Sequence, residues 1–199
     1  MSVQTARLVT VGHGTLAEDA LSQLLLGAGI TSLVDVRSAP GSRKNPQFGR
    51  AALEQWLPAS GIAYRWELRL GGFRKSDPHS LNVALRHPSF RGYADYMRTQ
   101  EFVEALDDLL FVPTDPHATG GERGDLVCIM CAESLWWRCH RRLIADAATL
   151  LRGIETTHLM HNGDEPIHRL TEGVRVDELG LLVYDANGEA PGANERPSS

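Results

Sequence analysis

Short apolar runs alternate along this chain with longer segments in which apolar residues recur every three or four positions. The short runs predict strands, at 7–11, 31–36, 62–68, 126–130 and 156–160, with 181–184 as a candidate sixth. The longer segments predict helices, at 21–28, 53–57, 102–110 and 143–151. Strand–helix–strand units need crossover connections, which place helices on both faces of a mainly parallel sheet. The pattern therefore predicts an α/β fold with three layers, similar to a Rossmann fold, in which the strand order stays open.

Length and composition fit one domain. The chain has 199 residues, of which 42% are apolar and 23% charged, as in an average globular protein. We expect a single α/β domain over 1–185. A stretch rich in Pro and Gly at 112–125 predicts a surface loop, and the composition of 186–199 predicts a disordered tail.

Charge and cysteine content narrow the class of protein. The longest apolar run covers 126–132, far short of the roughly 20 residues that span a bilayer, and the N-terminus has no apolar stretch typical of a signal peptide. Three cysteines, an odd number, favour reduced thiols and a cytoplasmic protein without membrane contact. A net charge of −5 argues against nonspecific coating of nucleic acid but permits a local basic site.

Polar residues and glycines gather where the predicted strands end. In chain order they are His13, Asp35, Arg37, Gly71, Gly72, Arg74, Cys131, Glu133, His158 and His161. The carboxyl ends of parallel strands meet at one edge of a sheet, and ligands of open α/β sheets bind there, close to helix N-termini. The sequence therefore predicts one site at this edge.

The segment that follows the fourth predicted strand carries the most reactive groups. A cysteine at a strand end that faces a helix N-terminus and arginines has a lowered pKa, so Cys131 is a candidate nucleophile. Glu133 is a candidate general acid or base, and Arg138 and Arg141 are candidate oxyanion binders. The alternative is that Cys131 is a small buried hydrophobe.

Helical spacing brings two further groups toward the same region. Cys139 lies four residues before Leu143, and His140 four before Ile144, so both face the apolar side of the helix. Plain core packing is one interpretation. The other is a zinc or iron site formed by Cys131, Cys139, His140 and a histidine at 158, 161 or 168. Seven residues separate the two cysteines, which does not match structural zinc knuckles, and we favour no metal.

The motifs together resemble the domain of unknown function 488 family of bacteria and archaea. The residues that carry the resemblance span about 8–160: Gly12-His13, Asp35-Val36-Arg37, Pro40, Ser42, Phe48, Tyr64, Leu70-Gly71-Gly72, Phe90, Tyr93, Met97, Cys131-Ala132-Glu133, Cys139-His140-Arg141 and His158. The resemblance implies that these residues form a shared site, but it implies no substrate. Gly14, where the family usually has Ser, and the Ser-Leu-Trp-Trp stretch after Glu133 depart from the pattern. The Asp-Val-Arg segment also resembles that of rhodanese-type sulfurtransferases, as a fold analogy only.

We therefore expect an enzyme, a cysteine-dependent transferase or hydrolase, that acts on a small anionic, phosphate- or nucleotide-like molecule and requires no cofactor. The expected catalytic residues are Cys131, Glu133, His140 and His13. The expected substrate-binding residues are Arg37, Asp35, Ser42, Gly71, Gly72, Arg74, Arg138 and Arg141. Two alternatives stay open. One is a metal-binding protein that uses Cys131, Cys139, His140 and His158, and the other is a nucleotide or nucleic-acid binding module in which Trp136 or Trp137 stacks on a base.

Overall fold

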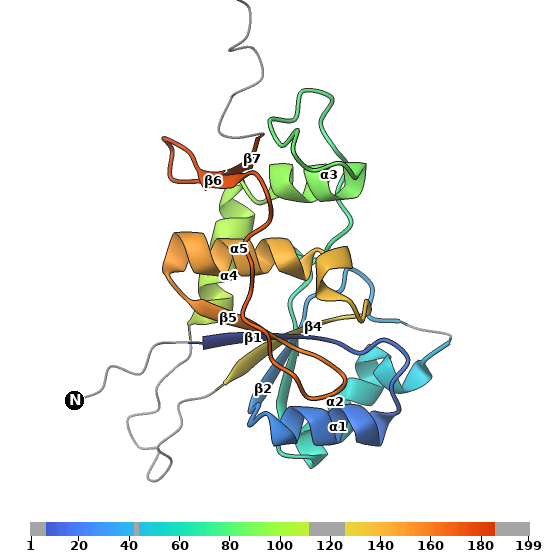
Figure 1. The fold of residues 1–199 in the computed structure, drawn as a ribbon. Helices are drawn as coiled ribbons and strands as arrows, with labels where there is room; N and C mark the ends of the chain where they lie inside the picture. The colour runs from blue at the N-terminus through green and yellow to red at the C-terminus, as the bar shows by residue number, and fades with distance from the viewer. Residues whose placement is uncertain (1–6, 42–43, 112–125, 186–199) are drawn as a thin grey trace, which may run out of the picture.

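The computed structural model describes residues 7–41, 44–111 and 126–185 (Figure 1). The predicted loop at 112–125 and the predicted tail at 186–199 lie outside the described residues, as does Ser42.

A five-stranded parallel sheet forms the centre of the molecule. Its strands, in chain order, are β1 (Arg7–Gly12), β2 (Ser32–Asp35), β3 (Ala63–Trp66), β4 (Val127–Cys131) and β5 (Glu155–Leu159). Their order in the sheet is β3-β2-β4-β1-β5. The predicted α/β class is confirmed. The order places β1, β2 and β4 side by side, which brings their carboxyl ends together.

Helices cover both faces of the sheet (Figure 1). On one face lie α1 (Glu18–Gly27) and α2 (Arg50–Ala59), and on the other α3 (Pro88–Tyr96), α4 (Gln100–Leu110) and α5 (Arg141–Arg152). Three short 3₁₀ helices, η1 (Pro46–Phe48), η2 (Leu68–Leu70) and η3 (Trp136–Arg138), interrupt the loops. Because side chains alternate along a strand, each strand contributes to two separate cores. Val9 packs on the α1 side and Leu8 on the α5 side.

The segment at 181–184 is a strand, but it does not join the main sheet. As β7 (Leu182–Tyr184) it pairs antiparallel with β6 (Val174–Val176) in a two-stranded sheet of its own, beside α3. The segment that follows β5 turns back along this edge strand and pairs with it through an antiparallel bridge between Thr157 and Ile167.

Sequence periodicity did not predict α3. The reason is its composition, since only Gly92, Tyr93 and Ala94 of its nine residues are buried. Gly92 is needed for close approach, because a Cβ there would lie 2.6 Å from the backbone of Lys75. None of the helices in the described part of the chain is long and apolar enough to cross a bilayer.

Candidate active site

The carboxyl ends of β1, β2 and β4 bring the predicted site residues to one edge of the sheet. The amide of His13 donates to the carbonyl of Cys131 at 3.0 Å, which continues the pairing of β1 with β4 beyond the strand ends. Arg37 follows β2, on the other side of β4, and its Nη1 atom lies 3.3 Å from Nε2 of His13. The thiol, the imidazole and the guanidinium therefore meet at this edge.

The alternation of side chains divides this site between the two faces of the sheet. Cys131 lies two residues after Ile129, which packs on the α5 side. His13 and Arg37 lie on the α1 and α2 side, where both contact Phe48. The site thus has a thiol half and a histidine–arginine half, separated by the last residues of the strands.

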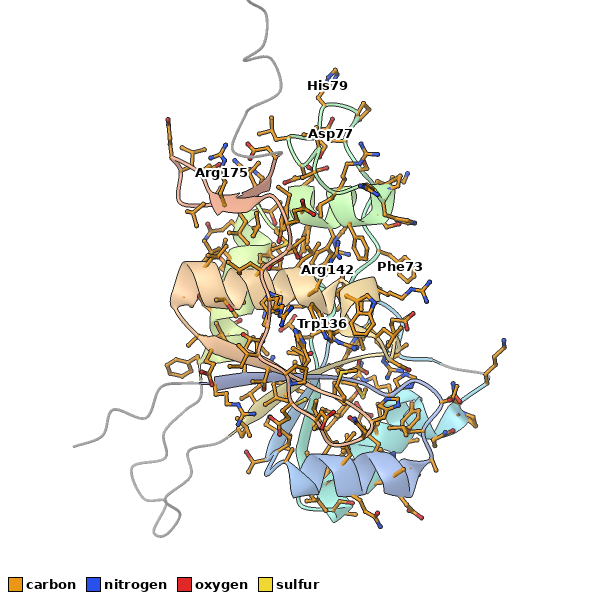
Figure 2. All side chains as sticks on the ribbon, viewed as in Figure 1. Phe73, Asp77, His79, Trp136, Arg142 and Arg175 are labelled. Carbon is orange, nitrogen blue, oxygen red and sulfur yellow. The ribbon has the colours of Figure 1, made fainter. Side chains whose placement is uncertain are left out.

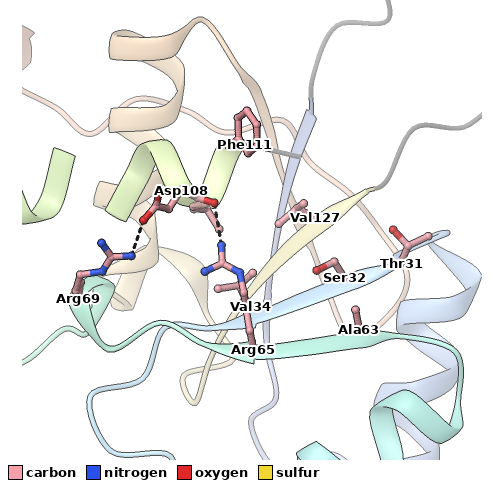
Figure 3. Close-up of a pocket in the computed structure, with 10 residues that line it drawn as sticks. Thr31, Ser32, Val34, Ala63, Arg65, Arg69, Asp108, Phe111 and Val127 are labelled. Carbon is pink, nitrogen blue, oxygen red and sulfur yellow. Dashed lines mark hydrogen bonds and ion pairs between the residues drawn. The ribbon is translucent and has the colours of Figure 1, made fainter. Parts of the chain in front are cut away.

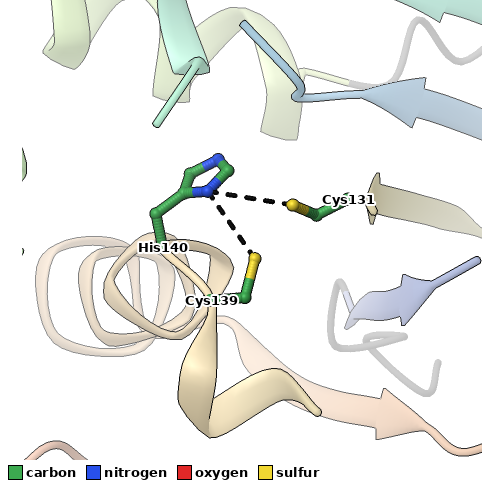
Figure 4. Close-up of side chains that lie close together, drawn as sticks. All are labelled: Cys131, Cys139 and His140. Carbon is green, nitrogen blue, oxygen red and sulfur yellow. Dashed lines mark hydrogen bonds between the residues drawn. The ribbon is translucent and has the colours of Figure 1, made fainter. Parts of the chain in front are cut away.

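The thiol half consists of Cys131, Cys139 and His140, here called the thiol cluster (Figure 4). The Nδ1 atom of His140 lies 3.9 Å from Sγ of Cys131 and 3.6 Å from Sγ of Cys139. Its Nε2 atom lies 3.0 Å from the carbonyl oxygen of Val36. A carbonyl only accepts hydrogen bonds, so Nε2 carries a proton and donates it. Nδ1 is therefore the nitrogen that faces the two sulfur atoms.

The two thiols of the cluster have opposite tendencies to ionise. The neighbouring Cys139, then His140 and the backbone N–H of Glu133, hold the pKa of Cys131 well below its usual range although the side chain is buried. Burial, and then the neighbouring Cys131, raise the pKa of Cys139. The third cysteine, Cys128, points into the opposite core, where burial raises its pKa. Of the two thiols in the cluster, Cys131 is therefore the one that ionises more readily.

Neighbouring segments fix the imidazole and nearly enclose the sulfur atoms. A Cβ on Gly72 would lie 2.5 Å from Nδ1 of His140, so only glycine allows the chain to pass here. The ring of Tyr93 meets the imidazole edge-on at 5.1 Å, and its hydroxyl donates to the Leu70 carbonyl at 2.9 Å. Cys131 is 9% exposed and Cys139 4%. A reacting atom that reaches this thiolate must therefore belong to a small molecule or to a narrow end of a larger one.

In the other half, a carboxylate and a guanidinium hold His13. Asp35 accepts from Nε of Arg37 at 2.8 Å and from Nη2 at 2.5 Å, and the hydroxyl of Tyr64 donates to it at 3.0 Å. Nδ1 of His13 is paired with the Gly14 carbonyl at 2.9 Å, and Nε2 faces Arg37. Burial, and then the charge of Arg37, lower the pKa of His13. His13 is therefore a neutral imidazole with both nitrogens in use.

One family model matches this chain. The family described as "Domain of unknown function DUF488" matches residues 17–148, about two thirds of the chain. The chain belongs to this family. No curated protein and no solved structure gives a significant match. The region matched to DUF488 contains Asp35, Arg37, Gly72 and the whole thiol cluster, whereas His13 and His158 lie outside it.

Several other predicted residues of the DUF488 site lie at its margin. The side chains of Glu133 and Arg138 are exposed, and the carboxylate of Glu133 accepts from the Leu135 amide at 3.4 Å. The guanidinium of Arg74 lies over the ring of Tyr96 at 3.9 Å. Gly71 packs against Ser38, where a Cβ would lie 2.8 Å from the hydroxyl oxygen.

Arg141 has a different position from the one expected of an oxyanion binder. It is 1% exposed, and its Nη1 atom donates to the carbonyls of Val11 at 3.1 Å and Glu133 at 2.6 Å, while Nη2 donates to Ser134 at 2.8 Å. Both Nη atoms already donate to backbone carbonyls, so they have little room for a ligand. Arg141 therefore fixes the loop after Cys131 to β1.

His158 is not a neighbour of the thiol cluster, which corrects the expected fourth metal ligand. Its Nδ1 atom pairs with the Thr10 hydroxyl at 2.7 Å and its Nε2 with His168 at 2.9 Å, and His168 continues to Asp146 at 2.9 Å. The ring of Trp136, labelled in Figure 2, stacks on His158 at 4.0 Å and 5°. These groups form a buried polar chain between β1, β5 and α5. Sequence spacing could have signalled it, because Asp146 lies among the buried residues of α5.

Two hollows lie away from the thiol cluster. One, of about 330 Å³, lies between the segments that follow β4 and β5 and is lined by Ser134, Leu135, Met160, His161, Asn162 and Asp164. The other, of about 580 Å³, lies between α4 and the amino-terminal ends of β2, β3 and β4 (Figure 3). Arg69 and Asp108 form an ion pair there at 2.7 Å. Because this hollow is at the opposite end of the strands from Cys131, it is not part of the candidate site.

Proposed function

We propose that this DUF488 protein is an enzyme that uses the Cys131 thiolate as a nucleophile toward a small anionic molecule, as a cysteine-dependent transferase or hydrolase. The observation that carries the proposal is the position of Nδ1 of His140, which faces Cys131 while Nε2 is fixed by Val36. Nδ1 takes the thiol proton, and the resulting imidazolium donates to the thiolate and to the carbonyl. This is the arrangement of an activated nucleophile and its base.

Three features support an anionic substrate. The thiol cluster lies at the N-terminus of α5, where the helix dipole favours negative charge. The backbone N–H of Glu133 helps to lower the pKa of Cys131, which favours negative charge at this position. Arg37 supplies a guanidinium on the other half of the same edge, and Arg138 an exposed one on η3. Because Cys131 is nearly enclosed, the reacting group should be no larger than a phosphate. A nucleotide would therefore have to enter with its terminal phosphate first.

Alkylation with a charged and an uncharged reagent tests the nucleophile and the preference for anions together. Iodoacetate and iodoacetamide differ in charge but transfer a group of similar size. We expect mass spectrometry to locate both labels on Cys131 at neutral pH, with iodoacetate favoured relative to its reaction with a free thiol. Cys131→Ser should abolish the labelling, and Cys128→Ser, as a matched control in the opposite core, should leave it unchanged. Equal, slow labelling of all three cysteines would contradict the proposal.

A metal centre is the second candidate function, because one donor atom from each residue of the thiol cluster lies within 4.8 Å of the others. Around a tetrahedral zinc ion, Cys sulfur and His nitrogen are separated by about 3.6 Å, given bonds of about 2.3 and 2.0 Å. The two sulfur–Nδ1 distances of 3.9 and 3.6 Å fit this value. Three protein ligands with a fourth position open are typical of catalytic zinc sites. Elemental analysis of untagged protein decides between the two candidate functions. A stoichiometric metal that is lost in His140→Ala would show that these residues are metal ligands and that Cys131 is not a free nucleophile.

A cytoplasmic location fits the proposed chemistry. All three cysteines are free in the structure, and a reducing compartment keeps such thiols available for reaction.

A further inference from the structure

We propose that the thiol cluster also reduces hydroperoxides, with Cys139 as a second thiol that closes a transient disulfide with Cys131. The proposal rests on the nucleophilic Cys131 proposed above and gives Cys139 a chemical step of its own. Its substrate class is a small hydroperoxide, with hydrogen peroxide as the simplest member.

The positions of the two sulfur atoms carry the first step of the argument. Cys131 ends β4, and Cys139 lies at the end of η3, directly before α5. Both sulfur atoms lie within 4.8 Å of Nδ1 of His140 and of each other. A disulfide has its sulfur atoms about 2.05 Å apart, so its formation requires the two side chains to rotate toward each other. Cys128 faces the other core and cannot join either of them.

The position of His140 supplies the proton transfers. The Cys131 thiolate attacks one oxygen of the hydroperoxide, the O–O bond breaks, and Cys131 becomes a sulfenic acid. The leaving oxygen takes the proton from Nδ1 of His140, so hydrogen peroxide yields water. Cys139 then transfers its S–H proton to the vacated Nδ1 and attacks the sulfur of Cys131. Hydroxide leaves with that proton as a second water, and an external thiol reduces the disulfide by exchange.

The enclosure of the cluster favours this substrate class. Cys131 is 9% exposed and the ring of Tyr93 and the chain at Gly72 close over His140, so a two-atom oxidant enters more easily than a bulky one. A sulfenic acid formed here has a thiol beside it and little solvent around it, which favours the disulfide over further oxidation.

The test uses the full chain, reduced and then treated with one equivalent of hydrogen peroxide. We expect peptide mapping to find a disulfide between Cys131 and Cys139, and we expect catalytic consumption of peroxide when dithiothreitol is present. Cumene hydroperoxide, which is bulky, should react at least tenfold more slowly. Cys139→Ser should stop at a sulfenic acid on Cys131, trapped by dimedone, and Cys128→Ser should behave as the unsubstituted protein.

Two results would overturn the proposal. One is oxidation of Cys131 to a sulfinic acid without any disulfide in the unsubstituted protein, and the other is a disulfide that includes Cys128. Either result is compatible with fast alkylation of Cys131, so the peroxide activity can fail while the proposed nucleophile stands. If Cys131 reacts with neither reagent, both proposals fail.

Discussion

The Nε2 atom of His140 lies 3.0 Å from the carbonyl oxygen of Val36. Because the carbonyl of Val36 can only accept, Nε2 must carry a proton, and Nδ1 is left to face the sulfur atoms. Val36 directly follows β2. A main-chain group at the end of one strand thereby sets the protonation of a side chain at the start of α5. Metal-binding and proton-transferring histidines are commonly oriented in this way.

His140→Asn should raise the pKa of Cys131, because the amide cannot accept the thiol proton. Once the pKa lies above the working pH, each further unit of increase lowers the thiolate population about tenfold, and we expect the rate of alkylation at neutral pH to fall with it. The rate should recover near pH 9.5, about a unit above the pKa of a free thiol. Stopped-time mass spectrometry across pH measures the profile. The exposed His79, replaced by Asn, is the matched control, and an unshifted profile for His140→Asn would refute the role of the imidazole.

Gly72→Ala should displace the imidazole, because the added Cβ would lie 2.5 Å from its Nδ1 atom and 2.8 Å from Cγ. Overpacking of this kind costs about 1–3 kcal/mol of unfolding free energy, and here it should also slow alkylation of Cys131. Urea denaturation and the labelling rate measure the two effects. Gly27→Ala is the control, since its Cβ meets nothing within 4 Å at the end of α1. Equal behaviour of the two variants would mean that the chain at Gly72 does not press on His140.

Stability should fall on acidification because of His158. Burial, and then His168, lower its pKa from 6.5 to about 3. Below pH 6.5 the unfolded chain takes a proton that the folded protein refuses until about pH 3, so the free energy of unfolding decreases over this window. The slope from this group is at most about 1.4 kcal/mol per pH unit, and the lowered pKa of His13 acts in the same direction. Urea denaturation at pH 7, 6 and 5 should give a shallower slope for His158→Asn than for the unsubstituted protein, and parallel slopes would contradict the assignment.

Asp146→Ala should destabilise the fold strongly. Asp146 accepts from His168 at 2.9 Å, from the Thr171 amide at 2.9 Å and from the Tyr184 hydroxyl at 3.0 Å, all in buried or partly buried surroundings. Removing it leaves these donors unsatisfied, at a cost of about 3–5 kcal/mol. Asp107→Ala, which removes an exposed pair with Arg152, should cost less than about 1 kcal/mol. Thermal and urea denaturation of the two variants test the difference, which should vanish if the buried polar chain contributes nothing.

Local sequence patterns predicted most of the fold and part of the site. The strands β1, β2 and β4 are mainly apolar runs, whereas β3 and β5 mix apolar and polar residues. Helical spacing predicted that Cys139 and His140 point inward, and both are buried beside Cys131, directly before α5. The division of the site between two faces was beyond the sequence. It depends on which strands are neighbours, and the order β2-β4-β1 follows from packing, not from any local pattern.

Long-range partners account for what the sequence misjudged. Arg141 is a basic residue in a reactive segment, and only the folded chain shows that the carbonyl of Val11, 130 positions away, surrounds it together with those of its own loop. His158 likewise has the chemistry of a metal ligand, but Thr10 and His168 use both of its nitrogens. An aspartate on the inner side of a helix, as Asp146 is, was the one local sign of these contacts.

The stacking of Trp136 on His158 gives the protein an optical probe of its own. Trp136 lies in the chain between Cys131 and Cys139, and its ring stacks on His158. Its ultraviolet emission should therefore change when the segment between the two cysteines shifts, and unlabelled protein then reports that shift in real time.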